Sequence, residues 1–420
     1  MRPEIRQRIE MIRRGEVPEG YKRLTDRIIP NDWYDYQLGD VGEVLMCKRV
    51  YANQTSEVGE IPFYKIGTFG KAADAFISRQ LYEDYRRKYS YPQKGDILIS
   101  AAGTLGKTVV YDGQEAYFQD SNIVWLKMDD RKLSNKYLIH YYQIINWPTP
   151  EGATIQRLYN GIIREAHIVA PAVSEQQKIA AILTTQDKVI ELKEKRLAEK
   201  LRQKKYLMQQ LLTGKKRLPG FAGKWKAYRL HEIVKHRTRR NDIGNTNVLT
   251  ISAQFGLINQ ADFFNKAIAS DDKSNYFLLK KDDFAYNKSY SSGYPFGAIK
   301  RLTRYDVGIV SPLYICFRRK SENVSGIFLE QYFDAGLMNH EIRAFAQEGA
   351  RNHGLLNIGV DDFFNSKIIL PSLDEQSAIA QVLSTADREI SLLRQDIEQE
   401  KQKKKALMQL LLTGIVRVCP

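Results

Sequence analysis

Two stretches of this chain carry apolar residues at alternating spacings of three and four, each over about forty residues. That stripe predicts two long amphipathic helices of the coiled-coil type, each about 60 Å long at 1.5 Å per residue. A Thr-Gly pair, with glycine at Gly214 or Gly414, is expected to end each helix. The first stripe contains Ile179, Leu183, Val189, Leu192, Leu197, Leu201, Met208 and Leu211. The second contains Ile379, Leu383, Ala386, Ile390, Leu393, Ile397, Leu407 and Leu411.

The two predicted helices are copies of one another. Residues 171–217 and 371–417 align without a gap, and twenty of the 47 positions are identical, where chance would give about three. The identical residues are Pro171, Glu175, Gln176, Ile179, Ala180, Leu183, Thr185, Asp187, Ile190, Leu192, Lys204, Lys205, Leu207, Met208, Gln209, Leu211, Leu212, Thr213, Gly214 and Arg217, each matched 200 positions later. Such a duplication predicts that the helices cross antiparallel about a pseudo-two-fold axis. The residues expected to pack the pair are Ile179, Leu183, Ile190, Leu211, Ile379, Leu383, Ile390 and Leu411.

Local signals predict how the helices begin and what their basic ends do. A short strand ending in proline precedes each helix, at residues 167–171 and 367–371. Ser174 and Asp374 are expected N-caps, and Gln177 would complete a capping box with Ser174. The lysines near the C-terminal ends either favour the helix dipole or form a solvated face. These lysines are Lys204, Lys205, Lys403, Lys404 and Lys405.

Each predicted helix follows a region rich in short strand-like runs and glycine turns. Residues 32–38 resemble residues 224–230, and each of these segments opens such a region. Strands are predicted at 95–100, 122–126, 283–287 and 313–317, and helices at 4–14, 136–146 and 326–347. The predicted segments are an N-terminal helix and arm (1–30), a first globule (31–173), a central helix (174–214), a second globule (215–373) and a C-terminal helix (374–420).

Length and composition narrow the class of protein. A chain of 420 residues is too long for a single core. No apolar run approaches a membrane span, and the N-terminus lacks the apolar core of a signal peptide, so we expect a cytoplasmic protein that does not contact membranes. The three cysteines, Cys47, Cys316 and Cys419, are too far apart for a zinc cluster and too few for a disulfide framework.

The charge points to a polyanionic partner. The net charge is +15, and 24 tyrosines often lie beside lysine or arginine, as in residues 82–91. Mixed basic and aromatic surface suits phosphate contacts and base stacking. It suits an ordinary amphipathic segment of a mildly basic protein almost as well, so charge alone leaves both interpretations open.

A search for catalytic motifs predicts a non-enzymatic chain. Residues 101–108 end like a phosphate-binding loop, but Ala101 stands where the first glycine is required and no helix is predicted after Lys107. The residue types and order of Asp187 and Glu191 roughly match a metal-binding nuclease motif. They lie on a predicted coiled coil, however, rather than on strands. No glycine-rich cofactor fingerprint, nucleophile triad or metal-ligand spacing is found, and no metal site is predicted.

Taken together, these motifs resemble those of the specificity subunits of type I restriction-modification enzymes, over essentially the whole chain. The segments that carry the resemblance are 4–10, 15–21, 29–33, the Pro-x-x-x-Glu-Gln starts at Pro171 and Pro371, the Leu-Leu-Thr-Gly ends at Gly214 and Gly414, 283–290, 293–300 and 308–314.

The resemblance implies an α+β fold in which two α/β target recognition domains alternate with the two coiled-coil helices. Each recognition domain would read one half of a split, non-palindromic site on double-stranded DNA. The helices would space the two halves and dock two methyltransferase subunits, which restriction and motor subunits join. S-adenosylmethionine, Mg²⁺ and ATP would bind those partners and not this chain.

Candidate DNA contacts follow from residue type and position in predicted loops, because base edges are read by cationic, amide and hydroxyl side chains. The alternative for each candidate is a turn residue that satisfies its own backbone. The candidates in the first domain are Lys48, Arg49, Ser100, Thr104, Lys107 and Gln119, and those in the second are Gln254, Asn287, Lys288, Ser289, Tyr290 and Tyr294.

Two other functions compete with DNA recognition. A coiled-coil scaffold without specific DNA binding would explain the long helices but not the charge or the paired globules. A free-standing nuclease or methyltransferase would need catalytic residues that the sequence does not show.

Overall fold

The chain folds into two compact units, each built from segments distant in sequence. The computed structural model describes residues 3–24, 27–145, 147, 157–252, 256–264, 272–290, 293–348, 354 and 356–418. Unit 1 comprises Met1–Lys193 with Asp396–Pro420, and unit 2 comprises Glu194–Gln395. Each unit therefore holds one globule, the first half of one long helix and the second half of the other. The segment boundaries proposed from the sequence stay a prediction, since packing groups the chain across them.

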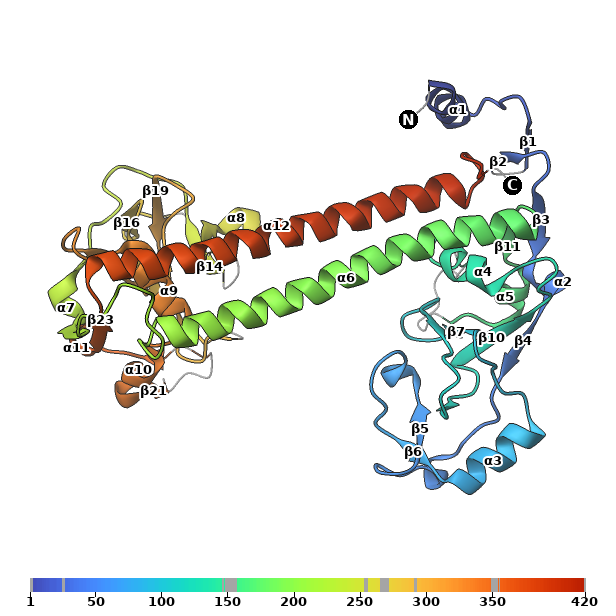
Figure 1. The fold of residues 1–420 in the computed structure, drawn as a ribbon, viewed down its shortest axis with the longest axis horizontal. Coiled ribbons are helices and arrows are strands. Elements are labelled where there is room, and N and C mark those ends of the chain that lie inside the picture. The colour runs from blue at the N-terminus through green and yellow to red at the C-terminus, as the bar shows by residue number, and fades with distance from the viewer. Residues whose placement is uncertain are drawn as a thin grey trace. The chain divides into compact units, whose positions relative to one another are not determined.

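The two long helices are α6 (Val173–Leu211) and α12 (Leu373–Leu411), each 39 residues long (Figure 1). Both end as predicted, at glycines with positive φ, +68° at Gly214 and +75° at Gly414. The predicted N-caps are wrong: Ser174 and Asp374 lie inside the first turn, because each proline-ended strand turns into helix within two residues. At α12 it is Ser372 whose hydroxyl accepts a hydrogen bond from the amide of Glu375, at 3.4 Å.

Within unit 1, α6 and α12 run antiparallel. Asp187 pairs with Lys404 at 2.6 Å, and Lys193 pairs with Glu400 and Asp396 at 2.8 Å each. Residue numbers rise along one helix as those of the partners fall along the other. Lys404 is thus an interhelical ion-pair partner rather than part of a solvated face.

Unit 2 repeats this pairing with the helices exchanged. Lys204 pairs with Asp387 at 2.5 Å and Lys200 pairs with Glu389 at 2.6 Å. Lys204 and Lys404 occupy matching positions in the duplicated segment, and so do their partners Asp387 and Asp187. The duplication therefore preserved an ion pair between helices as well as a sequence.

Buried apolar residues of α6 and α12 pack the helices against one another, and Ile190, Ile390 and Ile397 are among them near mid-helix. All eight residues predicted to pack the pair are buried: Ile179, Leu183, Ile190, Leu211, Ile379, Leu383, Ile390 and Leu411. Two other members of the predicted stripe are exposed, Leu192 by 53% and Leu201 by 40%, so their assignment to the contact face is wrong. Polar residues such as Gln186, which donates to Glu400 at 2.7 Å, add to the contact between the helices.

A clamp joins the end of α12 to the start of α6 in unit 1. Arg417 lies 2.7 Å from both Glu175 and Asp32, and its guanidinium stacks over the ring of Trp33 at 5.9 Å. Glu175 and Trp33 are buried, so the arginine compensates a carboxylate that has lost its water. The carboxyl of Asp32 has a lowered pKa because it accepts hydrogen bonds from Arg417.

Unit 2 contains the same clamp. Arg217 lies 2.5 Å from the buried Glu375 and 5.8 Å from the ring centroid of Trp225. Trp33 and Trp225 also open the two segments whose similarity is visible in the sequence. The two segments are similar in sequence because each contributes the tryptophan of an equivalent clamp.

Each globule contains its own four-stranded sheet, and the two sheets have equivalent strand orders although the sequences of the globules diverge. In unit 1 the strand order is β4-β10-β7-β8, and in unit 2 it is β13-β20-β17-β18. The unit 1 strands are β4 (Gly42–Met46), β7 (Ile97–Ser100), β8 (Thr108–Val110) and β10 (Ile123–Met128). Their unit 2 counterparts are β13 (Val234–His236), β17 (Phe284–Asn287), β18 (Ala298–Arg301) and β20 (Ile315–Arg319). All four strands predicted from the sequence are present.

Each globule joins the helices through an antiparallel strand pair. β3 (Tyr34–Gln37) pairs with β11 (His167–Ala170) in unit 1, and β12 (Lys226–Arg229) pairs with β23 (Lys367–Leu370) in unit 2. The short helices that follow β3 and β12 are α2 (Leu38–Val41) and α7 (Leu230–Ile233). The amide of Leu38 donates to Ala166 at 2.9 Å, and that of Leu230 donates to Ser366 at 2.9 Å. The correspondence extends to single backbone hydrogen bonds.

A helix at the same position in each unit ties the sheet to the long helices. These helices are α4 (Asn135–Tyr141) and α9 (Gly326–Asp334). Gln176 accepts from the amide of Ser134 at 3.0 Å, and Gln376 accepts from that of Ser325 at 2.9 Å. The predicted helix 136–146 is shorter than expected, with Asn146 outside the described residues. The single helix predicted at 326–347 is two helices, since Gly336 (φ +70°) separates α9 from α10 (Asn339–Phe345).

The remaining elements lie around these frames. Helix α1 (Pro3–Arg13) matches the predicted N-terminal helix. Unit 1 also contains β1 (Tyr21–Arg23), β2 (Ile28–Pro30), β5 (Ile61–Tyr64), β6 (Phe76–Ile77), β9 (Tyr117–Phe118), α3 (Arg79–Lys88) and α5 (Asn160–Glu165). Unit 2 also contains β14 (Leu249–Ser252), β15 (Gly256–Asn259), β16 (Phe277–Lys280), β19 (Val307–Val310), β21 (Gln347–Glu348), β22 (Leu356–Asn357), α8 (Gln260–Phe264) and α11 (Val360–Asn365).

Removing the arginine of the clamp should destabilise unit 1. Arg417→Met leaves Glu175 buried without its cation, which costs about 3–5 kcal/mol for an ion pair broken in the interior. We expect a clear fall in the melting temperature measured by calorimetry. Arg13→Met, at an exposed arginine of α1, is the matched control and should change little. Equal melting of both variants would show that the clamp contributes nothing.

The ion pairs between the helices should also make stability depend on pH. Hydrogen bonds from Lys193 and Gln186 lower the pKa of Glu400 from 4.5 to about 2. Because the folded pKa is depressed, the stabilisation is complete above pH 4.5 and is lost as the pH falls from 4.5 towards 2. Glu400→Gln should therefore melt earlier than the wild type at pH 7, and this gap should close below pH 4.5. Glu165→Gln, at an exposed site, serves as control, and a gap that does not vary with pH would contradict the assignment.

Candidate nucleic-acid interface

Three loops of unit 1 meet at one end of its four-stranded sheet. Strand pairing sets Met46 opposite Val124 and Ser100 opposite Ile123, so the end of β4, the end of β7 and the start of β10 are neighbours. The loops that leave from there comprise residues 47–51, 101–107 and 119–122. All six unit 1 candidates, Lys48, Arg49, Ser100, Thr104, Lys107 and Gln119, lie at this end of the sheet.

Ser100 shapes one of these loops from within. The residue is 1% exposed, its hydroxyl donates to the carbonyl of Thr104, and it accepts from the amide of Lys107 at 2.9 Å. Strand β8 follows the loop directly, as expected for a hairpin rather than a phosphate-binding loop. Thr104 is exposed on this loop, so it can present a hydroxyl where Ser100 cannot.

Lys107 and Gln119 fasten a neighbouring turn to the sheet. The ammonium of Lys107 donates to the carbonyl of Phe69 at 2.6 Å, and Gln119 accepts from the amide of Ile66 at 2.9 Å. Both side chains thus hold residues 66–69 beside the loops. In this conformation the polar groups of both side chains bind the backbone of that turn.

Lys48 and Arg49 are the exposed cations of the first loop. Lys48 lies over the ring of Tyr89 at 5.1 Å, and Arg49 pairs with Asp120 at 2.9 Å. The side chain of Arg49 is 58% exposed in spite of that pair. A lysine backed by an aromatic ring and an arginine held by a carboxylate are both oriented before any ligand arrives.

Sequence reasoning missed Arg157, which belongs to the same end of the sheet. Its guanidinium donates to the carbonyl of Ser121, in the loop before β10, at 2.7 Å and lies 6.0 Å from the ring of Tyr159. Tyr159 is 60% exposed. The signal was an Arg-x-Tyr pair, the same basic and aromatic alternation that is visible at residues 82–91.

Unit 2 places its candidates at the corresponding end of its own sheet. Asn287 ends β17, Lys288, Ser289 and Tyr290 follow it, and Tyr294 lies in the same β17–β18 connection. This connection corresponds to the loop between β7 and β8 in unit 1. Gln254 lies outside the described residues.

Contacts divide these candidates into internal and exposed groups. Asn287 donates to the hydroxyl of Tyr314 at 3.3 Å and accepts from the amide of Ser289 at 3.0 Å, which fixes the turn. Tyr294 accepts from Lys300 at 3.1 Å. Tyr290, by contrast, is 64% exposed, so its ring is available for stacking.

A basic loop after β13 was also missed. Arg237, Arg239 and Arg240 follow β13 directly, where Lys48 and Arg49 follow β4 in unit 1. Arg239 pairs with Asp242 at 3.0 Å, while Arg240 donates to the carbonyl of Asn275 and is exposed. The signal was a run of three arginines within four residues, immediately after a strand.

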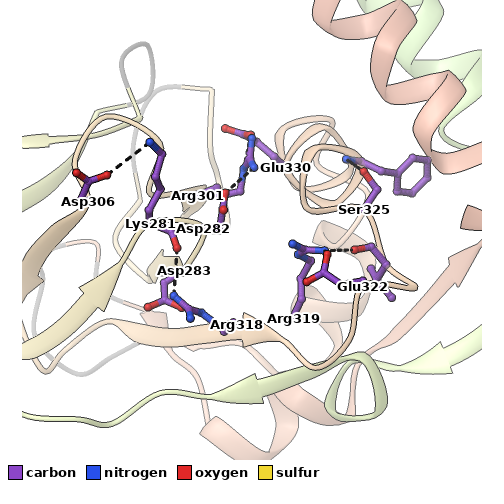
Figure 2. A network of polar contacts seen from close by, with 12 residues as sticks. Lys281, Asp282, Asp283, Arg301, Asp306, Arg318, Arg319, Glu322, Ser325 and Glu330 are labelled. Carbon is purple, nitrogen blue, oxygen red and sulfur yellow. Dashed lines mark hydrogen bonds and ion pairs between the residues drawn. The ribbon is translucent and has the colours of Figure 1, made fainter.

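A polar network fixes the opposite end of the unit 2 sheet (Figure 2). Arg301, at the end of β18, pairs with Asp282 and with Glu330 of α9 at 2.9 Å each. Arg318 pairs with Asp283 at 2.5 Å, and burial raises the pKa of that carboxyl. These pairs tie the sheet to the helix that contacts α12. By fixing the sheet at this end, the ion pairs also orient its other end, from which the candidate loops extend.

Other chemistry finds little support in the described part of the chain. No group of three or more His, Cys, Asp or Glu there could hold a metal ion. Burial raises the pKa of the Cys47 thiol to about 12 and raises that of Cys316, which keeps both thiols protonated and unreactive. Cys419 lies outside the described residues. None of the described helices is long and apolar enough to cross a membrane.

Curated proteins similar to this chain are type I specificity subunits. A putative type I restriction enzyme specificity subunit of Haemophilus influenzae is 58% identical over 147 residues, which are 35% of this chain and 38% of that protein. The putative MjaX specificity subunit of Methanocaldococcus jannaschii is 24% identical over 95% of this chain and 97% of its own length.

Solved structures support the fold. The S subunit of a type I restriction-modification system from M. genitalium has a TM-score of 0.54 at 12% identity, covering 95% of this chain and 99% of that one. A chain from a study of type I complex assembly and conformational transition has a TM-score of 0.53 at 14% identity, covering 92% of this chain and 99% of that one. The predicted α+β class and internal repeat are thereby confirmed.

The family profile described as "Type I restriction modification DNA specificity domain" matches residues 30–202 and again 223–402. The two matches cover most of the chain and both globules. As its motifs predicted, the chain belongs to the family of type I restriction-modification specificity subunits.

Proposed function

We propose that the chain reads a bipartite, non-palindromic DNA site, one half with each unit. The observation that carries this proposal is the repeated sheet, whose corresponding ends carry different cationic, amide and aromatic loops. Equivalent frames can approach two half-sites in the same way, while different loop residues read different bases. Each long helix contributes residues to both units, and we expect the helix pair to set the gap between the halves.

Exposure and internal hydrogen bonds together separate the side chains that would contact DNA from those that would position the loops. Lys48, Arg49 and Thr104 in unit 1 and Tyr290 in unit 2 are exposed and would contact DNA directly. Arg239 and Arg240 would join them at the phosphates, which cations neutralise whatever the sequence. The internal bonds of Ser100, Lys107, Gln119, Asn287 and Tyr294 favour roles in holding the loops, and the roles of Lys288, Ser289 and Gln254 stay predictions.

We further propose that this chain is the non-catalytic, recognising member of a larger complex. Two methyltransferase subunits would dock on it, and restriction and motor subunits would join that core. S-adenosylmethionine, Mg²⁺ and ATP would then belong to those partners. Family membership supports the association with DNA and with other subunits of the system.

A coiled-coil scaffold without specific DNA binding is the competing function, favoured only by the long helix pair. Selection from a pool of random-sequence duplexes separates the two functions. Recovery of two short specific blocks around a constant gap supports the DNA-reading function. Recovery of unenriched sequences by a chain that binds a methyltransferase supports the scaffold.

Lys48→Ala should weaken DNA binding without changing the selected sequence. If Lys48 contacts a phosphate, affinity falls for all duplexes and the slope of log affinity against log salt becomes shallower by about 0.9. Lys127→Ala, at an exposed lysine near the other end of β10, is the matched control and should keep the wild-type slope. Fluorescence anisotropy across a salt series measures both. An unchanged slope for Lys48→Ala would remove this residue from the interface.

A further inference from the structure

One arginine of the unit 1 loops is held in place by a carboxylate from a different loop. Arg49 lies in the loop that follows β4, and Asp120 lies in the loop that precedes β10. Nε of Arg49 donates to Oδ2 of Asp120 at 2.9 Å. The side chain of Arg49 is 58% exposed and that of Asp120 is 16% exposed, so a largely covered carboxylate anchors an arginine that remains accessible.

The loop that carries Asp120 is itself fixed on both sides of this residue. The amide of Gln119 donates to the carbonyl of Tyr64 at 2.9 Å. Ser121 has a left-handed backbone conformation, with a φ of +52°, which non-glycine residues seldom adopt. Its carbonyl accepts from Arg157 at 2.7 Å, which stabilises that conformation. The position of the carboxylate of Asp120 is therefore set by its loop before any ligand binds.

The hydrogen bond to Asp120 uses only one of the donors of Arg49. A guanidinium has five N–H donors in a planar fork, and here the bond is made by Nε. Among the residues that the structure describes, neither terminal nitrogen of Arg49 has a hydrogen-bond partner. The two terminal nitrogens thus offer a pair of donors whose orientation is fixed by the carboxylate.

Such a pair of donors matches the edge of a guanine in the major groove. Guanine presents two acceptors there, O6 and N7, and arginine bound to both is the commonest specific contact to a base. A phosphate also accepts paired donors, but its attraction depends on the charge of its partner. The pair of Arg49 with Asp120 has no net charge, and its carboxylate would repel a phosphate. An uncharged base edge gains from the oriented donors without that repulsion.

We propose that Arg49, oriented by Asp120, reads a guanine in the half-site bound by unit 1. This inference rests on the proposed function and assigns one base to one side chain. Arg49 determines specificity at that base, and Asp120 is a positioning residue that acts through it. Lys48, in the same loop, lies over the ring of Tyr89 and has no carboxylate partner among the described residues, so its charge stays free for a phosphate.

The Arg49→Lys variant tests the proposal, because lysine keeps the charge but not the planar fork. The full-length wild type and variant would each select from a pool of random-sequence duplexes. We expect the wild type to require guanine at one position of the half-site read by unit 1, and the variant to accept other bases at that position alone. The affinity of the variant for the wild-type site should fall about 5- to 150-fold, which corresponds to the loss of one bidentate contact to a base.

Two further variants supply a control and test the role of the carboxylate. Arg239→Lys is the matched control in the corresponding loop of unit 2, where the partner Asp242 is itself 55% exposed, and it should keep every selected base. Asp120→Ala should weaken the preference for guanine and raise the affinity for random duplexes, since Arg49 then carries an uncompensated charge. A carboxylate with a purely structural role would not raise that affinity.

The remaining outcomes contradict the proposal in distinguishable ways. Wild-type base preferences and affinity for Arg49→Lys would show that Arg49 binds a phosphate and would overturn the proposal, as would a changed preference at a base other than guanine. A lowered melting temperature of Arg49→Lys, together with weaker binding to every duplex, would mean that Arg49 only holds the loops, and would overturn it too. A wild type that selects no specific sequence would refute the proposed function, and this inference with it.

Discussion

The rest of the structure depends on the antiparallel pairing of α6 with α12. Most of the stability of a helix in a protein comes from tertiary packing of its apolar face, so each of these helices depends on the other lying against it. The ends of the pair are closed by a buried carboxylate under an arginine, Glu175 with Arg417 and Glu375 with Arg217. Burying a carboxylate is costly unless a cation accompanies it, so the clamp also disfavours a shifted register.

The helix pair holds each sheet in place, and each sheet in turn positions the candidate loops. A strand pair and a glutamine-capped helix attach each sheet to the start of a long helix. In unit 2 the ion pairs of Arg301 and Arg318 fix the near end of the sheet (Figure 2). The loops at the other end are then presented by a stiff frame, and their residues can change without disturbing it. This division explains how the globules could diverge while the helices kept twenty identities in 47 positions.

The sequence predicted the two long helices better than it predicted which of their residues are in contact. Duplicated positions such as Ile179 and Gly214 predicted the helices, their ends and their direction, because buried and left-handed positions tolerate few residues. The sequence analysis wrongly placed Leu192 and Leu201 on the contact face, since a stripe of apolar residues does not say which of its members face the partner helix.

The candidate site was only partly predictable for a different reason. Residue type identified Lys48 and Tyr290, but it could not distinguish them from Ser100, whose hydroxyl makes hydrogen bonds within its own loop. Arg157 and Arg240 were missed because their place beside the sheet end follows from strand order, which single-sequence patterns do not give. The equivalence of the two sheets, invisible in the letters, is what relates the loops to one another.

The central claim is that each unit reads its own half of the target. Residues 31–170 would be exchanged for the matching segment of a family member with a different target, and methylated adenines would be mapped across the genome of the source organism. The account predicts that one half of the methylated site changes, while the other half and the gap stay as they were. A change in both halves, or in neither, would contradict it.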